Sequence, residues 1–196
     1  MTAKSLNHLA FLAVIILSAP AVQAADSEGN KAYIVLNGGL YDDFADDLVL
    51  GGMIQIGYDL SKFFAIEGHF GLTAENDDDI SGARVEKQLY HASVVVRGNL
   101  RGEDYAFFLF AGQSYLNLDY EIMSPGSGSG HKDETDLTYG IGTDLYGDEN
   151  TAITVKWQRL IDIDGDKSKG EEDGEIDVIF VGITYYFGDA RIPSWY

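Results

Sequence analysis

The amino-acid sequence predicts an all-β protein, an eight-stranded antiparallel up-and-down transmembrane β-barrel. Three observations lead to this fold class: an N-terminus patterned as an export signal, eight segments of alternating polarity, and connectors that alternate between short and long. Membranes admit strands only as closed barrels, because every backbone polar group in hydrocarbon must be paired within the protein. Each strand then needs about 9–11 tilted residues.

The first 24 residues have the pattern of a cleavable signal peptide. Lys4 precedes a short apolar run over 9–17, and Val22-Gln23-Ala24 offers small residues at a cleavage position. The run is shorter than the roughly 20 residues of a membrane-spanning helix. We therefore expect a signal peptide over 1–24 and one barrel domain over 25–196. The barrel would be exported through the inner membrane and inserted, multi-pass, into a Gram-negative cell outer membrane.

Composition limits the classes of partner and chemistry. The formal net charge is −19, or −20 without Lys4, which makes nucleic acid a poor partner. The chain contains no cysteine, so disulfide bonds and lipidation of an N-terminal cysteine are excluded. Hydrophobic residues make up 45% of the chain, with 12 Tyr and 10 Phe, and this argues against disorder. Acidic and aromatic residues together suit a barrel with solvated ends and an apolar middle.

Alternation of apolar and polar residues defines the strands. The eight segments are 31–40, 48–58, 63–74, 84–98, 105–121, 135–146, 151–162 and 175–187. In the last one, Ile179, Val181, Ile183, Tyr185 and Phe187 share a face. A half-buried strand of a soluble protein also alternates, so the length and number of the segments carry the argument. A soluble lipocalin-like barrel is the main alternative, but it would bury its bulky apolar face, whereas here the charged residues share one face.

Connector length alternates along the chain. Short turns are expected at 59–62, 99–104 and 147–150, and longer acidic loops at 41–47, 75–83, 122–134 and 163–174. Outer-membrane barrels have short periplasmic turns and longer extracellular loops. Aromatic residues near strand ends are expected to form the two interfacial girdles: Tyr41, Tyr58, Phe63, Tyr105, Tyr120, Tyr146, Tyr185 and Phe187.

Two stretches carry a family resemblance. Asp136-Leu137-Thr138-Tyr139-Gly140-Ile141-Gly142 and the terminal Gly182-Ile183-Thr184-Tyr185-Tyr186-Phe187 resemble the small outer-membrane β-barrel family of the OmpA/OmpX type, a porin-like barrel domain. The resemblance implies an assembly signal at Gly182, Tyr185 and Phe187, which the barrel-assembly machinery would recognise during insertion. It also implies contact with outer-membrane lipid and lipopolysaccharide. Phe180 departs from the pattern, which usually has a polar residue there. These motifs specify a fold and an insertion route, and no activity.

Alternation assigns a set of polar side chains to the lumen: Gln55, Glu67, His69, Lys87, His91, Ser93, Arg97, Gln113, Asn117, Asp119, Asp136, Asp144, Lys156 and Gln158. Side chains alone fill an eight-stranded barrel, and buried charges must be paired. Counting along the strands puts Glu67, Arg97, Asp144 and Lys156 in the periplasmic half, where we expect one ion-pair network that plugs the lumen. The alternative is a small, low-conductance porin.

His91 and Ser93 are the strongest candidates for catalysis. They resemble the His-x-Ser pair on a barrel strand of outer-membrane lipid A deacylases, with Glu67 or Glu103 as the orienting acid. Alternation directs both side chains into the lumen, away from lipid, so we assign no catalytic residue and expect no enzymatic activity. A deacylase-like, lipid A-modifying enzyme is a further alternative.

The long connectors hold the remaining candidate site. Asp162, Asp164 and Asp166 are spaced as in the first half of a calcium loop, although Lys167 and Asp173 break the EF-hand pattern. A Ca²⁺ or Mg²⁺ site is therefore one hypothesis and a solvated acidic fringe the other; no further cofactor is indicated. We expect a monomeric, plugged barrel with acidic extracellular loops and a structural or surface-interaction role.

Overall fold

The computed structural model describes residues 31–42, 48–80, 83–123, 128–163 and 174–187. Its elements are all strands: β1 Ala32–Asp42, β2 Leu48–Asp59, β3 Phe64–Thr73, β4 Asn76–Ile80, β5 Ala83–Arg101, β6 Tyr105–Met123, β7 Ser129–Tyr146, β8 Thr151–Ile163 and β9 Gly174–Tyr186. Within these ranges, no helix is long and apolar enough to cross a membrane. The predicted signal peptide lies outside the described residues.

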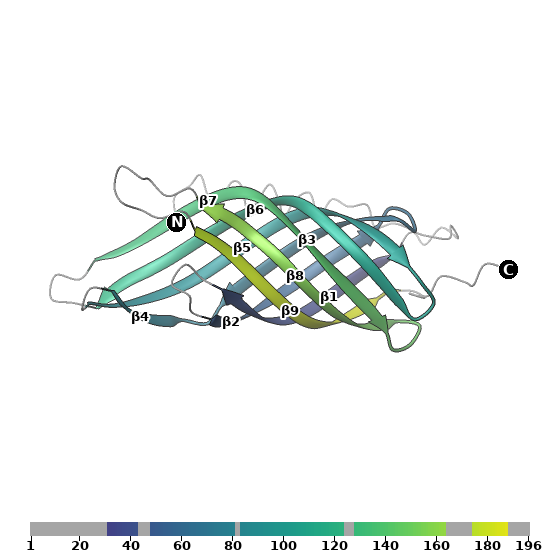
Figure 1. Ribbon diagram of the computed structural model, residues 1–196, viewed down its shortest axis with the longest axis horizontal. Coiled ribbons are helices and arrows are strands. Elements are labelled where there is room, and N and C mark those ends of the chain that lie inside the picture. Colours follow the sequence, from purple (N-terminus) through teal and green to yellow (C-terminus); the bar gives the residue numbers. More distant parts are fainter. Residues whose placement is uncertain (1–30, 43–47, 81–82, 124–127, 164–173, 188–196) are drawn as a thin grey trace.

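Eight of the strands close into one antiparallel barrel (Figure 1). Each pairs with its neighbour in the chain, β1 pairs with β9, and β3 pairs with β5. The closed circuit leaves no unpaired strand edge in the membrane, which is the condition for strands to exist in hydrocarbon. The predicted eight-stranded barrel is thus confirmed, and its short turns mark the periplasmic end.

The opposite end differs from the prediction, because strands occupy much of two expected loops. The short strand β4 pairs with β5 beyond the end of β3, inside the connector expected at 75–83. β6 and β7 continue through most of 122–134, pairing as far as Glu121 and Ser129. Figure 1 shows β4 to β7 projecting at one end of the barrel, on the left. Antiparallel pairing satisfies backbone groups in water as well, so a strand pair need not stop at the membrane surface.

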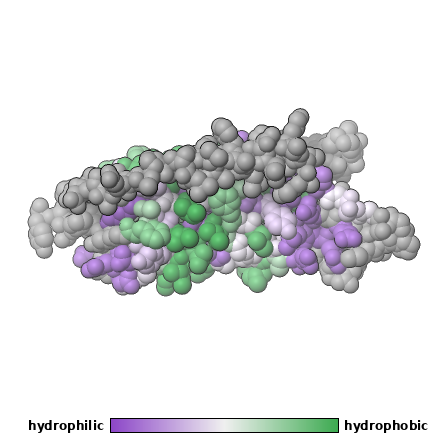
Figure 2. Space-filling model, turned by 180° about the vertical axis from the view of Figure 1, so that it is seen from behind, coloured by the Kyte–Doolittle hydropathy of each residue, from purple (hydrophilic) through white to green (hydrophobic). Residues whose placement is uncertain are grey.

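An apolar belt surrounds the barrel. On β9 the outward Ile179, Val181 and Ile183 are exposed, whereas Val178 and Phe180, at the alternating positions, are fully buried. Figure 2 shows hydrophobic surface gathered midway along the visible face, with hydrophilic side chains toward both ends. Hydrocarbon would solvate such a belt without any polar partner, which is the pattern of outer-membrane barrels.

The predicted interfacial position was wrong for two of the eight girdle aromatics. Tyr41 and Tyr146 are buried in the lumen rather than placed at the lipid interface. Both continue the inward alternation of their strands, since Tyr33, Val35 and Asn37 are buried on β1 and Thr138 and Asp144 are buried on β7. The exposed members are Phe63, Tyr105, Tyr185 and Phe187, Tyr58 is half-buried, and the side chain of Tyr120 lies outside the described set.

Lumen-facing glycines make room for the inward rings. A Cβ on Gly57 would lie 2.1 Å from the Tyr33 ring, and one on Gly71 would lie 2.0 Å from Nε2 of His91. Gly142 is covered in the same way by Phe108, 2.4 Å from the position of a Cβ. Each ring therefore lies directly over a glycine of the adjacent strand. This packing lets bulky residues fill a lumen too narrow for rings that point to its axis.

Candidate functional site

A cluster of buried charges closes the periplasmic half of the lumen. Arg97 on β5 donates from Nη1 to Oε1 of Glu67 at 3.1 Å and from Nη2 to Oδ2 of Asp144 at 2.5 Å. Its Nε donates to Oδ1 of Asn99 at 2.6 Å, and its guanidinium lies 3.6 Å from the centre of the Phe108 ring. One cation thus joins carboxylates of β3 and β7, so side chains of three strands converge on a single point of the lumen.

Neutral donors complete this cluster. Five side chains donate to its carboxylates over 2.5–3.2 Å: Tyr33, Gln55 and His69 to Glu67, and Thr154 and Tyr186 to Asp144. Charges removed from water are tolerated only with such paired and hydrogen-bonded surroundings. Tyr33, Thr154 and Tyr186 were not among the residues predicted for the site. Alternation was the available signal, because each is two or four residues from another lumen-facing position on its strand.

Lys156 lies in the lumen but outside this ion-pair network, which differs from the expectation. Its Nζ donates to Oε1 of Gln158 at 3.0 Å and lies 3.8 Å from the sulfur of Met53. The rings of Phe110 and Phe180 flank it, with centres 5.1 and 5.0 Å away. Among the described residues it forms no ion pair. Cation–π attraction and the amide oxygen replace a carboxylate as its partners.

A second ion pair lies closer to the periplasmic end. Nη2 of Arg101 donates to both carboxylate oxygens of Asp59, at 2.6 and 2.7 Å, and Asp59 is fully buried. Both residues were predicted to lie in short turns. β2 and β5 in fact extend to Asp59 and Arg101, so both positions continue the inward face of their strands.

The extracellular half of the lumen holds an apolar cluster. Nine buried residues form its core cluster: Tyr41, Val49, Met53, Leu89, Leu116, Leu160, Ile176, Val178 and Phe180. Each of these side chains is at most 7% exposed. The side chains predicted for the lumen were all polar. An interior packed with side chains has no need of polarity where no charge must be paired, and burial of apolar area stabilises the barrel there.

Three members of the predicted lumen set were wrong, and all three lie on β6. Gln113 and Asp119 are exposed and Asn117 is half-buried, whereas Ser114 and Leu116 between them are buried. The lower part of β6 is apolar on both faces, so alternation did not fix which face is inward. Further along, the strand has left the hydrocarbon, and polar side chains face outward into water.

The other members of the predicted set follow the expected direction. Buried are Gln55, Glu67, His69, His91, Ser93, Arg97, Asp144, Lys156 and Gln158. Lys87 and Asp136 share the inward alternation of their strands but are half-buried, because they lie in the extracellular extension of β5 and β7.

His91 and Ser93 on β5, the pair considered for catalysis, do not have a catalytic arrangement. Nε2 of His91 is hydrogen-bonded to the hydroxyl of Tyr41 at 2.9 Å, and Oγ of Ser93 donates to Oγ of Ser114 at 3.1 Å. Both side chains are buried in the lumen. A nucleophilic serine needs a hydrogen bond to its histidine and access to substrate, and this arrangement supplies neither.

The remaining predicted sites are only partly described. Tyr185 and Phe187 face outward with their rings 5.3 Å apart. Gly182 faces inward, where a Cβ would lie 2.3 Å from Oδ1 of Asn37, so local packing also accounts for glycine there. Asp162 is in β8 but its side chain is not described, and Asp164 and Asp166 lie outside the described residues.

Comparisons with known proteins show which family and which solved structures have this architecture. Residues 9–187 match the model of the outer membrane protein beta-barrel domain family. Similar structures include OprG from Pseudomonas aeruginosa (TM-score 0.62, 14% identity, covering 83% of this chain and 98% of that one). Ail of Yersinia pestis, in complex with the heparin analogue sucrose octasulfate, has a TM-score of 0.56 at 17% identity, over 82% of this chain and 100% of that one. Neisserial surface protein A has 0.58 at 9% identity, over 80% and 96%.

At these identities the structures share the fold. No curated protein matches the chain. The matched family and the outward apolar belt place the protein in the bacterial outer membrane. The chain belongs to the outer membrane protein β-barrel domain family.

Proposed function

We propose that this protein is a non-conducting barrel that presents an acidic extracellular ribbon for interaction at the cell surface. The supporting observation is the continuous filling of the lumen. The Arg97 cluster occupies the periplasmic half, the apolar cluster around Phe180 occupies the extracellular half, and Lys156 is flanked by the rings of Phe110 and Phe180. Ions crossing this interior would have to displace side chains that are almost completely buried.

Conductance in planar bilayers tests the closed lumen. The refolded wild type is expected to give no steady single-channel current. The double variant Arg97→Ala, Lys156→Ala removes two lumen cations, and Arg159→Ala is the matched control because Arg159 lies on the outer wall, paired with Asp177 and Glu175. A steady wild-type current that changes in the double variant and not in the control would make the protein a small porin and overturn the proposal.

The projecting strands β5 to β7 are the surface available to a partner. Their described acidic residues include Asp119, Glu121 and Glu134, all beyond the apolar belt, of which Asp119 and Glu121 are exposed and Glu134 is half-buried. With a net charge of −19, the chain favours a cationic partner. The sulfated ligand of the similar Ail structure is anionic, whereas the partner proposed here is cationic. Two proteins that share a fold need not share a ligand.

Binding to charged surfaces tests this part. The barrel in nanodiscs is expected to bind immobilised polylysine and not heparin, with binding lost as salt rises. Neutralising Asp119, Glu121 and Glu134 to the corresponding amides should weaken the binding. The matched control neutralises Glu103, Asp104 and Glu149 in the periplasmic turns. Equal loss in both triple variants would mean that net charge alone, and no extracellular surface, governs the interaction.

A further inference from the structure

A groove crosses the lipid-facing wall of the barrel from β1 to the projecting part of β7. Its floor near β1 and β2 is made of Gly38 and Gly52, which are paired across the two strands. A Cβ on Gly38 would meet nothing within 4 Å, and one on Gly52 would meet only a backbone oxygen at 3.6 Å. These glycines therefore differ from those of the lumen, because no ring covers them. They leave a depression in a wall of larger apolar side chains.

Strand register shows that the groove climbs toward the extracellular side. The pairings Gly38–Gly52–Leu72–Tyr90–Asn117–Asp133 form one unbroken row across β1, β2, β3, β5, β6 and β7. Gly38 lies six residues beyond the start of β1, and Asn117 lies twelve beyond the start of β6. With strands tilted about 40° and rising about 3.3 Å per residue, the β6 end is roughly 15 Å higher. One end of the groove is thus in hydrocarbon and the other above it.

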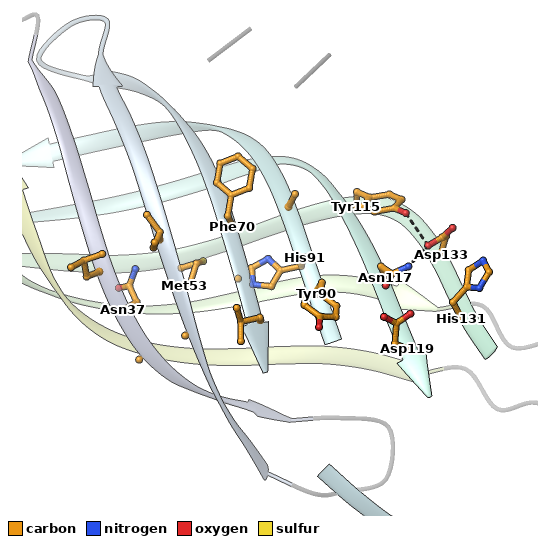
Figure 3. A pocket seen from close by; sticks show the side chains of 17 residues that line it. Asn37, Met53, Phe70, Tyr90, His91, Tyr115, Asn117, Asp119, His131 and Asp133 are labelled. Carbon is orange, nitrogen blue, oxygen red and sulfur yellow. Dashed lines mark hydrogen bonds between the residues drawn. The ribbon is translucent and has the colours of Figure 1, made fainter. Parts of the chain in front are cut away.

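The character of the lining changes along this row. The lower end is apolar, with Leu36, Ile54 and Phe70 beside the glycine floor. The upper end is polar: Oδ1 of Asp133 accepts hydrogen bonds from Tyr115 at 2.8 Å and Asn117 at 2.6 Å. Figure 3 shows these side chains together, with Asp119 and His131 beside them.

The upper end is an acceptor site with negative charge. The hydrogen bond from Asn117 is the main reason why the pKa of Asp133 lies below its usual range, so the carboxylate is ionised at neutral pH. Its second oxygen, Oδ2, accepts no hydrogen bond from the described residues. Asp119 adds a second carboxylate to the same rim.

We propose that this groove holds one outer-leaflet lipid, with an acyl chain along Gly38 and Gly52 and an ammonium-bearing head group at Asp133. The polarity gradient follows the long axis of such a molecule, tail below and head above. A primary ammonium brings positive charge and three N–H donors to the open carboxylate oxygens. A head group with phosphate alone would meet two like charges. The small-residue floor lets the chain approach the strand backbone closely, where dispersion contacts are largest.

Native mass spectrometry of the full-length protein in mixed micelles tests the proposal. The probes are phosphatidylethanolamine, phosphatidylcholine and phosphatidylglycerol with identical acyl chains at equal concentration. We expect one retained phosphatidylethanolamine per barrel, in preference to the other two. Gly38→Leu with Gly52→Leu should lower retention roughly tenfold, about 1.4 kcal/mol. Gly98→Leu is the matched control, because Gly98 also faces lipid with space for a side chain but lies outside the groove.

Asp133→Asn separates the head group from the tail. This variant should lose the preference for phosphatidylethanolamine while it still retains a lipid. Heat-modified migration on gels establishes that every variant is folded. Equal retention of the three lipids by the wild type would overturn the head-group assignment. Equal effects of the Gly98 and groove variants, or a dimer in place of a lipid adduct, would overturn the groove assignment.

Discussion

Removal of the central lumen cation should destabilise the barrel strongly. In Arg97→Met, the carboxylates of Glu67 and Asp144 lose the guanidinium that contacts both at 3.1 and 2.5 Å. Both carboxylates are almost fully buried, so they keep only their neutral donors. Removing one partner of a buried ion pair costs about 3–5 kcal/mol, because the remaining charge is left without compensation. We expect a loss of that size in the free energy of unfolding.

Reversible urea unfolding from lipid vesicles measures this loss, with tryptophan fluorescence, to which the lipid-facing Trp157 contributes, as the signal. The triple variant Arg97→Met, Glu67→Gln, Asp144→Asn removes all three charges and should recover at least half of the loss, because a neutral cluster has no unpaired ion. Arg159→Met is the control, since Arg159 is only partly buried at the outer wall and should cost less than about 1 kcal/mol. Equal instability of the single and triple variants would refute the reasoning from charge and leave lost packing as the cause.

Three further outcomes follow from the packing, the belt and the extracellular ribbon. Gly142→Ala should cost about 1–3 kcal/mol in urea unfolding by overpacking, because its Cβ would lie 2.4 Å from a ring, whereas Gly38→Ala should change stability by less than about 0.5 kcal/mol. Val181→Arg, in the middle of the exposed belt of β9, should cost about 2–4 kcal/mol in the same assay. In a carboxyl NMR titration, Asp133 should titrate below the usual range for aspartate, and Asn117→Ala should move its pKa upward. An unchanged pKa in Asn117→Ala would contradict that hydrogen bond.

The direction of the pKa shift of Asp133 determines how its contribution to stability changes with pH. Because the pKa of Asp133 is lowered in the folded protein, its hydrogen bonds favour the folded state above the pKa of the unfolded chain. That contribution is lost as pH falls through the folded pKa. Asp133 is largely exposed, so the effect should appear in the local titration of the ribbon and hardly at all in the stability of the barrel.

Alternation predicted the fold because the belt imposes it on every strand. On β9 every second residue from Ile179 to Phe187 is apolar or aromatic and lies outside, so the sequence alone was sufficient to assign that face. The prediction failed on β6, where Phe107 and Phe108 are both apolar and only the structure shows that Phe108 is the one inside. A narrow lumen accepts rings as readily as polar groups, so polarity alone does not identify its face.

Part of the polar cluster in the lumen could also be predicted from the sequence. Burial requires charges to pair, and the structure brings Glu67, Arg97 and Asp144 together. The partners of Lys156 could not be predicted from the sequence. Aromatic rings and an amide can replace a carboxylate as partners of a buried cation, and strand periodicity does not distinguish between them. Likewise, the extension of β6 and β7 beyond the membrane depends on pairing between strands, which periodicity within one strand does not report.

Several lumen glycines are each covered by a ring from the adjacent strand. The glycine and the ring residue can therefore be substituted only together. At Gly57 a side chain has room only if Tyr33 on the neighbouring strand becomes smaller, and the same holds for Gly71 and His91. Lumen substitutions should therefore be acceptable as cross-strand pairs and harmful singly. The outer wall follows the opposite rule, because lipid yields to any new apolar side chain. Randomised libraries of the inner face would need to vary both members of a pair at once, whereas libraries of the outer face can vary one position at a time.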